Sequence, residues 1–111
     1  MAKAIITITR HLEPDTDSTF NIPADASRKD RAADLKRRDA WRAGEWDYVG
    51  VIARATIKIP YGAASITATI DSPGLWGVEN DSGEDYLAHV FGEERATLLD
   101  MLESLKDYEV A

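Results

Sequence analysis

The sequence predicts an α+β domain in which a C-terminal amphipathic helix covers a mainly antiparallel sheet of three or four strands. Three observations carry this prediction. Residues 48–60 alternate in the period of a half-buried strand, and the apolar face expected to turn inward consists of Val49, Val51, Ala53, Ala55, Ile57 and Ile59. Residues 84–107 place their large apolar side chains on one side of a helical wheel. A second helix, rich in charged side chains, is predicted near residues 28–43 because this stretch contains neither Gly nor Pro.

Four extended segments supply the predicted sheet. Residues 4–12 are rich in β-branched side chains and predict the first strand, and residues 48–60 predict the clearest one. After a connection at residues 61–64, Ile66, Ala68 and Ile70 alternate with polar residues, so a hairpin with these three side chains facing inward is expected. Residues 75–79 predict a short strand, in which we expect Trp76 to lie in the core.

Capping patterns mark the starts of both helices. Ser27 precedes the charged helix, and Gly44 is expected to end it. Its large apolar side chains, Leu35 and Trp41, fall far apart on the wheel, so this helix is expected to cover a core only thinly.

The C-terminal helix is strongly amphipathic. Ser82 and Asp85 have the spacing of a capping box, and Gly92 marks an expected bend. Glu94 falls on the apolar face, where it requires a partner such as Arg54 or a place beyond the sheet edge. The side chains expected to face the sheet are Leu87, Val90, Phe91, Leu98, Met101, Leu102 and Leu105.

Composition narrows the function classes. The chain of 111 residues is expected to be a single domain, 1–111, and its 44% of hydrophobic residues suffices for a core. The net charge of −7 disfavours binding to nucleic acid or anionic membranes and favours partners with a basic surface. Without cysteine there is no disulfide or thiol nucleophile, and no segment is apolar enough to span a membrane, so a cytoplasmic protein of the host cell is expected.

Two segments resemble small proteins encoded by bacteriophages and prophages. One runs from Trp41 to Ile57 and reads WRAGEWDYVGVIARATI, and the other runs from Ser72 to Ser82 and reads SPGLWGVENDS. Tyr86-Leu87 and a Glu-rich, Leu-rich helix then follow, as they do in those proteins. The resemblance spans residues 41–105 and implies a phage or prophage origin, but it carries no catalytic residues over to this chain.

The expected solvent face of the C-terminal helix is acidic. Its residues recur at spacings of three and four, which places them in one stripe along the helix. They are Asp85, His89, Glu93, Ala96, Asp100, Glu103 and Asp107. Residues 71–111 carry a charge of −9. Such a stripe is typical of a solvated helix face, and it is also able to compete with phosphates for a basic groove.

The charged helix carries basic and aromatic side chains. It holds seven of the thirteen basic residues, diluted by three aspartates. Arg31, Arg38 and Arg42, with Trp41 and Trp46, have the composition of a protein-binding hot spot or a single-strand stacking surface. Internal pairing of these charges on a solvated helix is the simpler interpretation.

Metal and catalytic chemistry find little support in the sequence. His11, Glu13, Asp15 and Asp17 alternate as ligands would, but Pro14 interrupts them and no calcium-loop pattern is present. His89 is interpreted as a surface side chain. With two histidines and no phosphate-binding or nucleophile motif, neither an enzyme nor a cofactor or metal site is predicted.

These observations favour a non-enzymatic, phage-type accessory protein that binds a host protein. In its concrete form, the hypothesis is that the chain blocks a nucleic-acid-handling defence complex, as an anti-CRISPR-like inhibitor would, through the acidic stripe, with the arginine and tryptophan surface as a second contact. Two alternatives stay open. In the first alternative, the chain is a virion or morphogenesis component that forms homo-oligomers through its sheet edge and aromatic side chains. In the second, it binds single-stranded nucleic acid through Trp41 and the neighbouring arginines.

Overall fold

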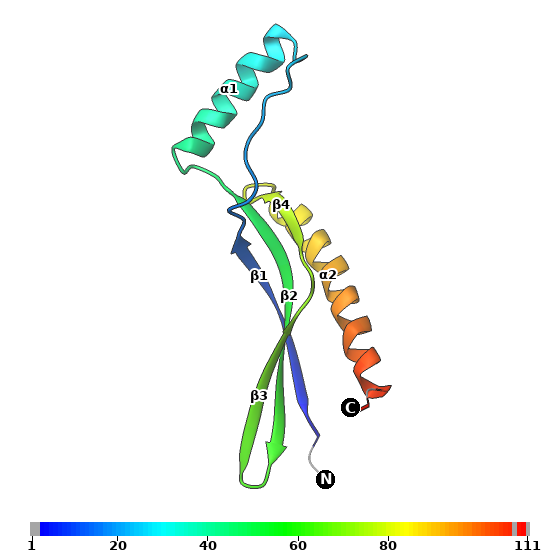
Figure 1. Ribbon diagram of the computed structural model, residues 1–111. Coiled ribbons are helices and arrows are strands. Elements are labelled where there is room, and N and C mark those ends of the chain that lie inside the picture. Colours follow the sequence, from blue (N-terminus) through cyan, green and yellow to red (C-terminus); the bar gives the residue numbers. More distant parts are fainter. Residues whose placement is uncertain (1–2, 108, 111) are drawn as a thin grey trace.

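The computed structural model describes residues 3–107 and 109–110 and has the predicted α+β architecture (Figure 1). The elements in order are β1 (Ile5–Pro14), α1 (Arg28–Arg42), β2 (Tyr48–Tyr61), β3 (Ala64–Asp71), β4 (Leu75–Glu79), α2 (Glu84–Ser104) and a 3-10 turn, Leu105–Asp107. Each predicted element is present, with boundaries that differ from the prediction by three residues at most.

The long strand β2 organises an antiparallel sheet of four strands. β1 pairs with it along one edge, from Ile5 opposite Lys58 to Pro14 opposite Val49. Along the other edge, β3 pairs with residues 54–61 and β4 with residues 48–51. Ser72 bridges these two short strands, because its backbone N–H donates to the Ala53 carbonyl and its hydroxyl accepts from the Ala53 N–H. Two strands therefore share one side of β2, and the pairing with β4 contains a register shift between Val49 and Val51.

α2 packs on one face of the sheet and forms the core with it. The β2 residues that point toward the helix are the ones predicted to face inward, from Val49 to Ala55. Near the start of the helix, Leu87 and Val90 contact Val49, Val51 and Val78. Farther along, Leu98 contacts Ala53 and Ala55, and Met101 and Leu102 pack against this second cluster.

Two predictions about α2 are wrong in detail. Its N-cap is Gly83, and the Ser82 hydroxyl donates to the Glu79 carbonyl rather than capping the helix. Leu105, expected to face the sheet, lies beyond the helical segment and is exposed. At Gly92 the helix does not break, because a glycine on an exposed side of a packed helix costs only about 1 kcal/mol.

Trp76 also differs from the prediction, since it lies outside the core and is 48% exposed. Its indole ring lies over Gly50, where a β-carbon would collide with it, and over Gly74. The ring Nε1 donates to the Pro73 carbonyl at 3.0 Å. Trp76 therefore clamps the turn between β3 and β4 on the sheet face opposite α2.

α1 forms an arm that projects from the end of the sheet (Figure 1). Ser27 caps it as predicted, by accepting from the Asp30 N–H, and Gly44 follows its end with a positive φ of 78°. α1 buries none of its residues. The molecule is consequently 66 Å long and 27 Å wide, and its radius of gyration of 19.6 Å exceeds the roughly 13 Å of a compact domain of this size.

Candidate functional site

The candidate site is the solvent face of α2. Asp85, Glu93, Asp100 and Glu103 are all exposed on it, and we call these four residues the acidic row. The helix turns these side chains outward because Leu87, Val90 and Leu98 fix its opposite side against the sheet. Asp107, the last predicted member of the stripe, ends the 3-10 turn, and its side chain lies outside the described residues.

The cations of the chain leave the acidic row largely uncompensated. Glu93 pairs only with His89, at 3.1 Å, and Glu103 pairs with Lys106 at 2.9 Å. Within residues 3–107 and 109–110, the carboxylates of Asp85 and Asp100 have no ion pair. The row thus keeps a negative potential that reaches solvent.

Two arginines of the body, Arg10 and Arg54, pair with carboxylates outside the acidic row. Arg10 binds Glu84 through both of its terminal nitrogens, at 2.7 and 3.1 Å, and these hydrogen bonds lower the pKa of Glu84. Arg54 binds Asp71 through Nε and one terminal nitrogen, at 2.7 and 3.0 Å, on the open sheet face, and this pairing lowers the pKa of Asp71. Charge pairing is therefore concentrated on the sheet and at the N-terminus of α2.

Glu94 has a different partner from the one expected. Its carboxylate accepts from the Ser72 hydroxyl at 2.9 Å and from the Gly74 N–H at 2.6 Å. Arg54 is not available to it, because Arg54 points to the opposite face of the sheet. A carboxylate on the apolar side of α2 thus holds the crossing from β3 to β4 in place and has a structural role.

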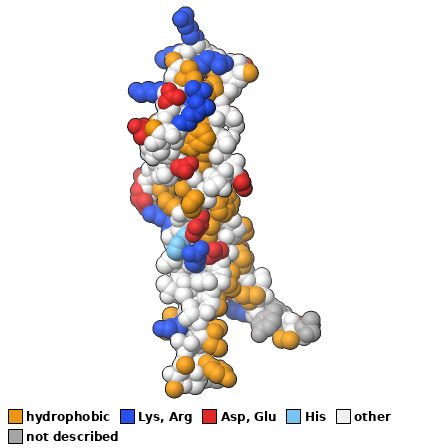
Figure 2. All heavy atoms as spheres, turned by 60° about the vertical axis from the view of Figure 1, so that its left-hand side comes forward, with side chains coloured by type: hydrophobic (Ala, Val, Ile, Leu, Met, Phe, Trp, Pro, Cys, Tyr) orange, Lys and Arg blue, Asp and Glu red, His pale blue; other side chains and the backbone are white. Residues whose placement is uncertain are grey.

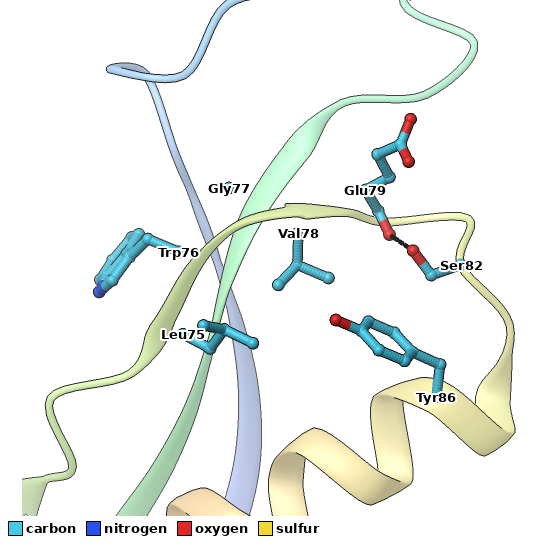
Figure 3. A pocket seen from close by; sticks show the side chains of 7 residues that line it. All are labelled: Leu75, Trp76, Gly77, Val78, Glu79, Ser82 and Tyr86. Atoms are coloured by element: carbon cyan, nitrogen blue, oxygen red, sulfur yellow. Dashed lines mark hydrogen bonds between the residues drawn. The ribbon is translucent and has the colours of Figure 1, made fainter.

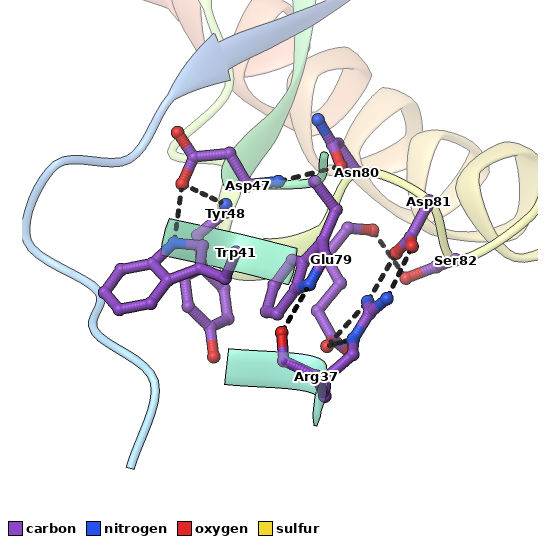
Figure 4. Close-up of polar contacts among 9 residues, drawn as sticks. Arg37, Trp41, Asp47, Tyr48, Glu79, Asn80, Asp81 and Ser82 are labelled. Carbon is purple, nitrogen blue, oxygen red and sulfur yellow. Dashed lines mark hydrogen bonds and ion pairs between the residues drawn. The ribbon is translucent and has the colours of Figure 1, made fainter. Parts of the chain in front are cut away.

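Arg37 makes the ion pairs that anchor the arm to the body (Figure 4). It donates two hydrogen bonds to Asp81, at 2.6 and 2.7 Å, and two to Glu79, at 3.0 and 3.3 Å. Its guanidinium carbon lies 3.8 Å from the centroid of the Trp46 ring, and the Trp46 Nε1 donates to the Arg37 carbonyl. This contact lowers the pKa of Asp81, mainly through the hydrogen bonds from Arg37.

The tryptophans predicted to bind a partner are part of this anchor. Trp46 is 2% exposed, so its prediction as a contact residue is wrong. Its ring packs edge-on against Phe20 and Tyr48, with centroids 5.9 and 5.1 Å away. Trp41 is half-buried and donates to the Asp47 carboxylate. These rings contact one another, and a nucleic-acid base would have to displace a neighbour in order to stack on them.

The predicted arginines of α1 have separate environments. Arg31 donates to the backbone carbonyls of Pro23 and Ala24 and so ties the preceding loop to the helix. Arg38 lies 3.5 Å from Asp39, and Arg42 is exposed in the last turn. Figure 2 shows Lys and Arg side chains concentrated at the arm end of the molecule. The basic and acidic surfaces are therefore separated along the long axis.

A hollow of about 550 Å³ lies between β4 and the first turn of α2 (Figure 3). Leu75, Val78 and Tyr86 face one another across it, while the Glu79 carboxylate turns away toward Arg37. Ser82 lies at its rim and is occupied by its bond to the Glu79 carbonyl. This arrangement offers apolar contact and one phenol, and it does not pair a nucleophile with a base.

Asp15, one of the ligand-like residues and the first residue after β1, has a structural role in the fold. Asp15 accepts hydrogen bonds from the Ser18 hydroxyl and from the backbone N–H groups of Gly77, Asp17 and Ser18. These bonds lower its pKa and join the end of β1 to β4. No cluster of three potential metal ligands occurs among the described residues.

Sequence reasoning missed an apolar surface at the other end of the molecule. The strands β2 and β3 extend past the end of α2, and side chains predicted to be inward are exposed there: Ile66 is 51% and Ile59 40% accessible. The prediction that Ile66 faces a core is therefore wrong, although its side of the sheet is as expected. Comparing the length of a 14-residue strand, about 46 Å, with that of a 21-residue helix, about 31 Å, would have revealed the uncovered end.

Comparisons with family models, with curated proteins and with solved structures found no match to this chain. In the part of the chain that the structure describes, no helix is both long enough and apolar enough to cross a bilayer.

Proposed function

We propose that this chain is a non-enzymatic accessory protein of phage type that acts by binding a basic surface of a host protein. The observation that supports the proposal is the acidic row of α2, which stays exposed and largely uncompensated although the chain has thirteen Lys and Arg residues. A protein that neutralises this row gains electrostatic attraction without competing against pairs already formed within the chain.

The class of partner follows from the form of the row. Four carboxylates spread over about five turns of one helix present negative charges along a line, as a nucleic-acid backbone does. The favoured partner is therefore a protein whose basic groove binds nucleic acid, and the proposed action is the stoichiometric blocking of that groove. A defence complex of the host, blocked as by an anti-CRISPR inhibitor, is the concrete form of this proposal.

Charge reversal tests the proposal. The variant Glu93→Lys/Asp100→Lys/Glu103→Lys is compared with Asp17→Lys/Asp25→Lys/Glu45→Lys, which makes the same change in net charge at exposed positions away from α2. Tagged proteins are incubated with a nuclease-treated bacterial lysate, and each captured protein is purified and mixed with labelled duplex DNA. We expect the wild type and the control to displace the DNA, and the α2 variant to lose at least tenfold in binding.

Equal binding by both variants would contradict the proposal, because the position of the carboxylates would then be irrelevant. Capture of a protein that binds no nucleic acid would contradict the groove-blocking action. Circular dichroism verifies that the reversed side chains, which are all exposed, leave the fold intact.

A further inference from the structure

The free end of the β2–β3 hairpin has an apolar face that α2 does not reach. The last row of the sheet under the helix consists of Ile8, Ala55 and Ile70. Beyond it, every residue on the same side of the three strands is apolar, and we call this set the hairpin face. It consists of Ile6, Ile57, Ile59, Tyr61, Ala64, Ile66 and Ala68.

The opposite side of the same strands is mainly polar. Thr7, Thr56 and Thr69 lie on it, with Lys58 and Thr67 farther toward the turn, and Ile5 and Pro60 are the apolar exceptions. An antiparallel sheet that alternates in this way typically has one face in water and the other buried. In β2 and β3 the apolar side chains stay on one side beyond the end of α2, where the described chain does not cover them.

The exposure of the hairpin face is substantial. Ile6 is 49% and Tyr61 73% exposed, in addition to Ile59 and Ile66. The face continues into a cleft of about 400 Å³ between β1 and the end of α2, where Leu99 and Leu102 form the helix side. Figure 2 shows hydrophobic side chains at this end, where the hairpin and the end of α2 diverge. Contiguous apolar surfaces of this kind mark protein interfaces.

The distribution of charged residues indicates which kind of protein covers the hairpin face. Residues 48–70 contain no Asp or Glu, and the only charged residue between 55 and 70 is Lys58. In a chain of net charge −7, this end is the part where two copies approach each other without repulsion between carboxylates.

We propose that a second copy of this chain covers the hairpin face, forming a two-fold dimer in which the hairpins overlap and the bodies point in opposite directions. The direction follows from the position of α2 on the same side of the sheet as the hairpin face. If the strands of the two copies ran in the same direction, the two α2 helices would lie against each other. When they run in opposite directions, the hairpin of each copy lies beside the C-terminal end of the other copy's α2, in line with the cleft.

The rows of the hairpin face suit this symmetry. The middle row, Ile59 beside Ile66, lies on the two-fold axis and contacts its own symmetry mate. In the dimer, Ile57 and Ala68 of one chain lie over Tyr61 and Ala64 of the other. The large side chains of the two β2 strands then contact each other, and so do the small side chains of the two β3 strands. Both sheets bury their apolar sides at a spacing of about 10 Å.

The test measures mass in solution with light scattering, from low to high micromolar concentration. We expect about twice the 12.3 kDa of one chain for the wild type. Ile66→Glu, which places a charge on the axis, should reduce the mass to that of one chain and weaken association at least a hundredfold. The matched control is Thr67→Glu, the next residue on the same strand, which points to the polar side beside Lys58 and should leave the dimer intact.

Crosslinking gives a second measurement that does not depend on a destabilising substitution. The chain has no cysteine, so Ile66→Cys and Thr67→Cys each carry a single thiol. A short bis-maleimide, which alkylates one thiol at each end, should join two chains through position 66 and not through position 67. A monomer at all concentrations, loss of the dimer in Thr67→Glu, an open series of larger oligomers, or equal crosslinking at both positions would each overturn the proposal. None of these outcomes bears on the charge-reversal test of α2.

Discussion

Asp15 shows how one residue joins two distant segments of this fold. Its carboxylate accepts four hydrogen bonds, including one at 2.7 Å from the Gly77 N–H in β4. These donors stabilise the ionised form and lower its pKa below the ordinary value of 3.8, the Ser18 hydroxyl contributing most. The stability that Asp15 supplies is therefore fully present above its unfolded-state pKa and is lost as the pH falls through the lower folded-state pKa.

Replacing Asp15 by Asn should consequently change the acid sensitivity of the protein. An amide has one oxygen and cannot accept hydrogen bonds at both positions of the carboxylate, so we expect a lower melting temperature at neutral pH. The further decrease in melting temperature between about pH 5 and about pH 2 should be smaller than in the wild type. Thermal denaturation followed by circular dichroism measures both quantities. Asp17→Asn, an exposed carboxylate nearby, is the control and should keep the acid dependence of the wild type. An unchanged acid dependence in Asp15→Asn would contradict this account.

Single residues also mark the limit of what the sequence reveals. Trp76 follows a strand and is flanked by Leu75 and Val78, which is the local setting of a core residue. The structure places it on the opposite sheet face because Gly50, on the neighbouring strand, leaves room for its ring. Likewise, the partner of Glu94 depends on where the crossing from β3 to β4 passes. Such contacts between distant segments have no signal in local periodicity.

At the scale of elements, few side chains hold the arm to the body, and Arg37 makes the ion pairs among these contacts. α1 buries no residue, and Arg37 links it to Glu79 and Asp81 while stacking on Trp46. We expect Arg37→Ala to lower the free energy of unfolding by about 1–2 kcal/mol, because its ion pairs are partly screened by water and the ring contact adds a modest amount. Amides of α1 should also exchange hydrogen faster.

Lys36→Ala is the matched control for this prediction. It removes one positive charge from the neighbouring exposed position of the same helix, and Lys36 has no ion pair within the described residues. Chemical denaturation and hydrogen exchange with mass spectrometry should show little change in this variant. If the two variants behaved alike, the arm would be held by something other than Arg37.

The sequence was sufficient to predict which helices and strands exist. The position at which α2 ends along β2 was not considered. Alternation in β2 and the apolar side of α2 are strong local signals, and both elements are confirmed. The acidic row was found for the same reason, because helical spacing alone places Glu93 and Asp100 on one side. The hairpin face escaped because it depends on where α2 ends relative to β2, and Trp46 was misjudged because its charged sequence neighbours conceal the aromatic cluster around it.

The whole molecule separates three kinds of surface along one axis. The basic arm lies at one end, the acidic row along the body, and the carboxylate-free hairpin at the other end (Figures 1 and 2). This separation lets the molecule use its apolar end for one contact while the acidic row stays free for another. An antiparallel dimer through the hairpin would place two acidic rows on opposite halves of one particle.

The length of the particle in solution tests this arrangement as a whole. One chain is 66 Å long, so two chains that overlap only at their hairpins should form a particle of about 115 Å, given an overlap of about five residues of strand. Small-angle X-ray scattering measures this dimension, and Ile66→Glu should reduce it to that of one chain with a radius of gyration near 20 Å. A dimer that kept the length of one chain would instead have its copies side by side. In that case like-charged α2 helices would lie near each other, and the particle should dissociate more readily at low salt, which the hairpin dimer should not do.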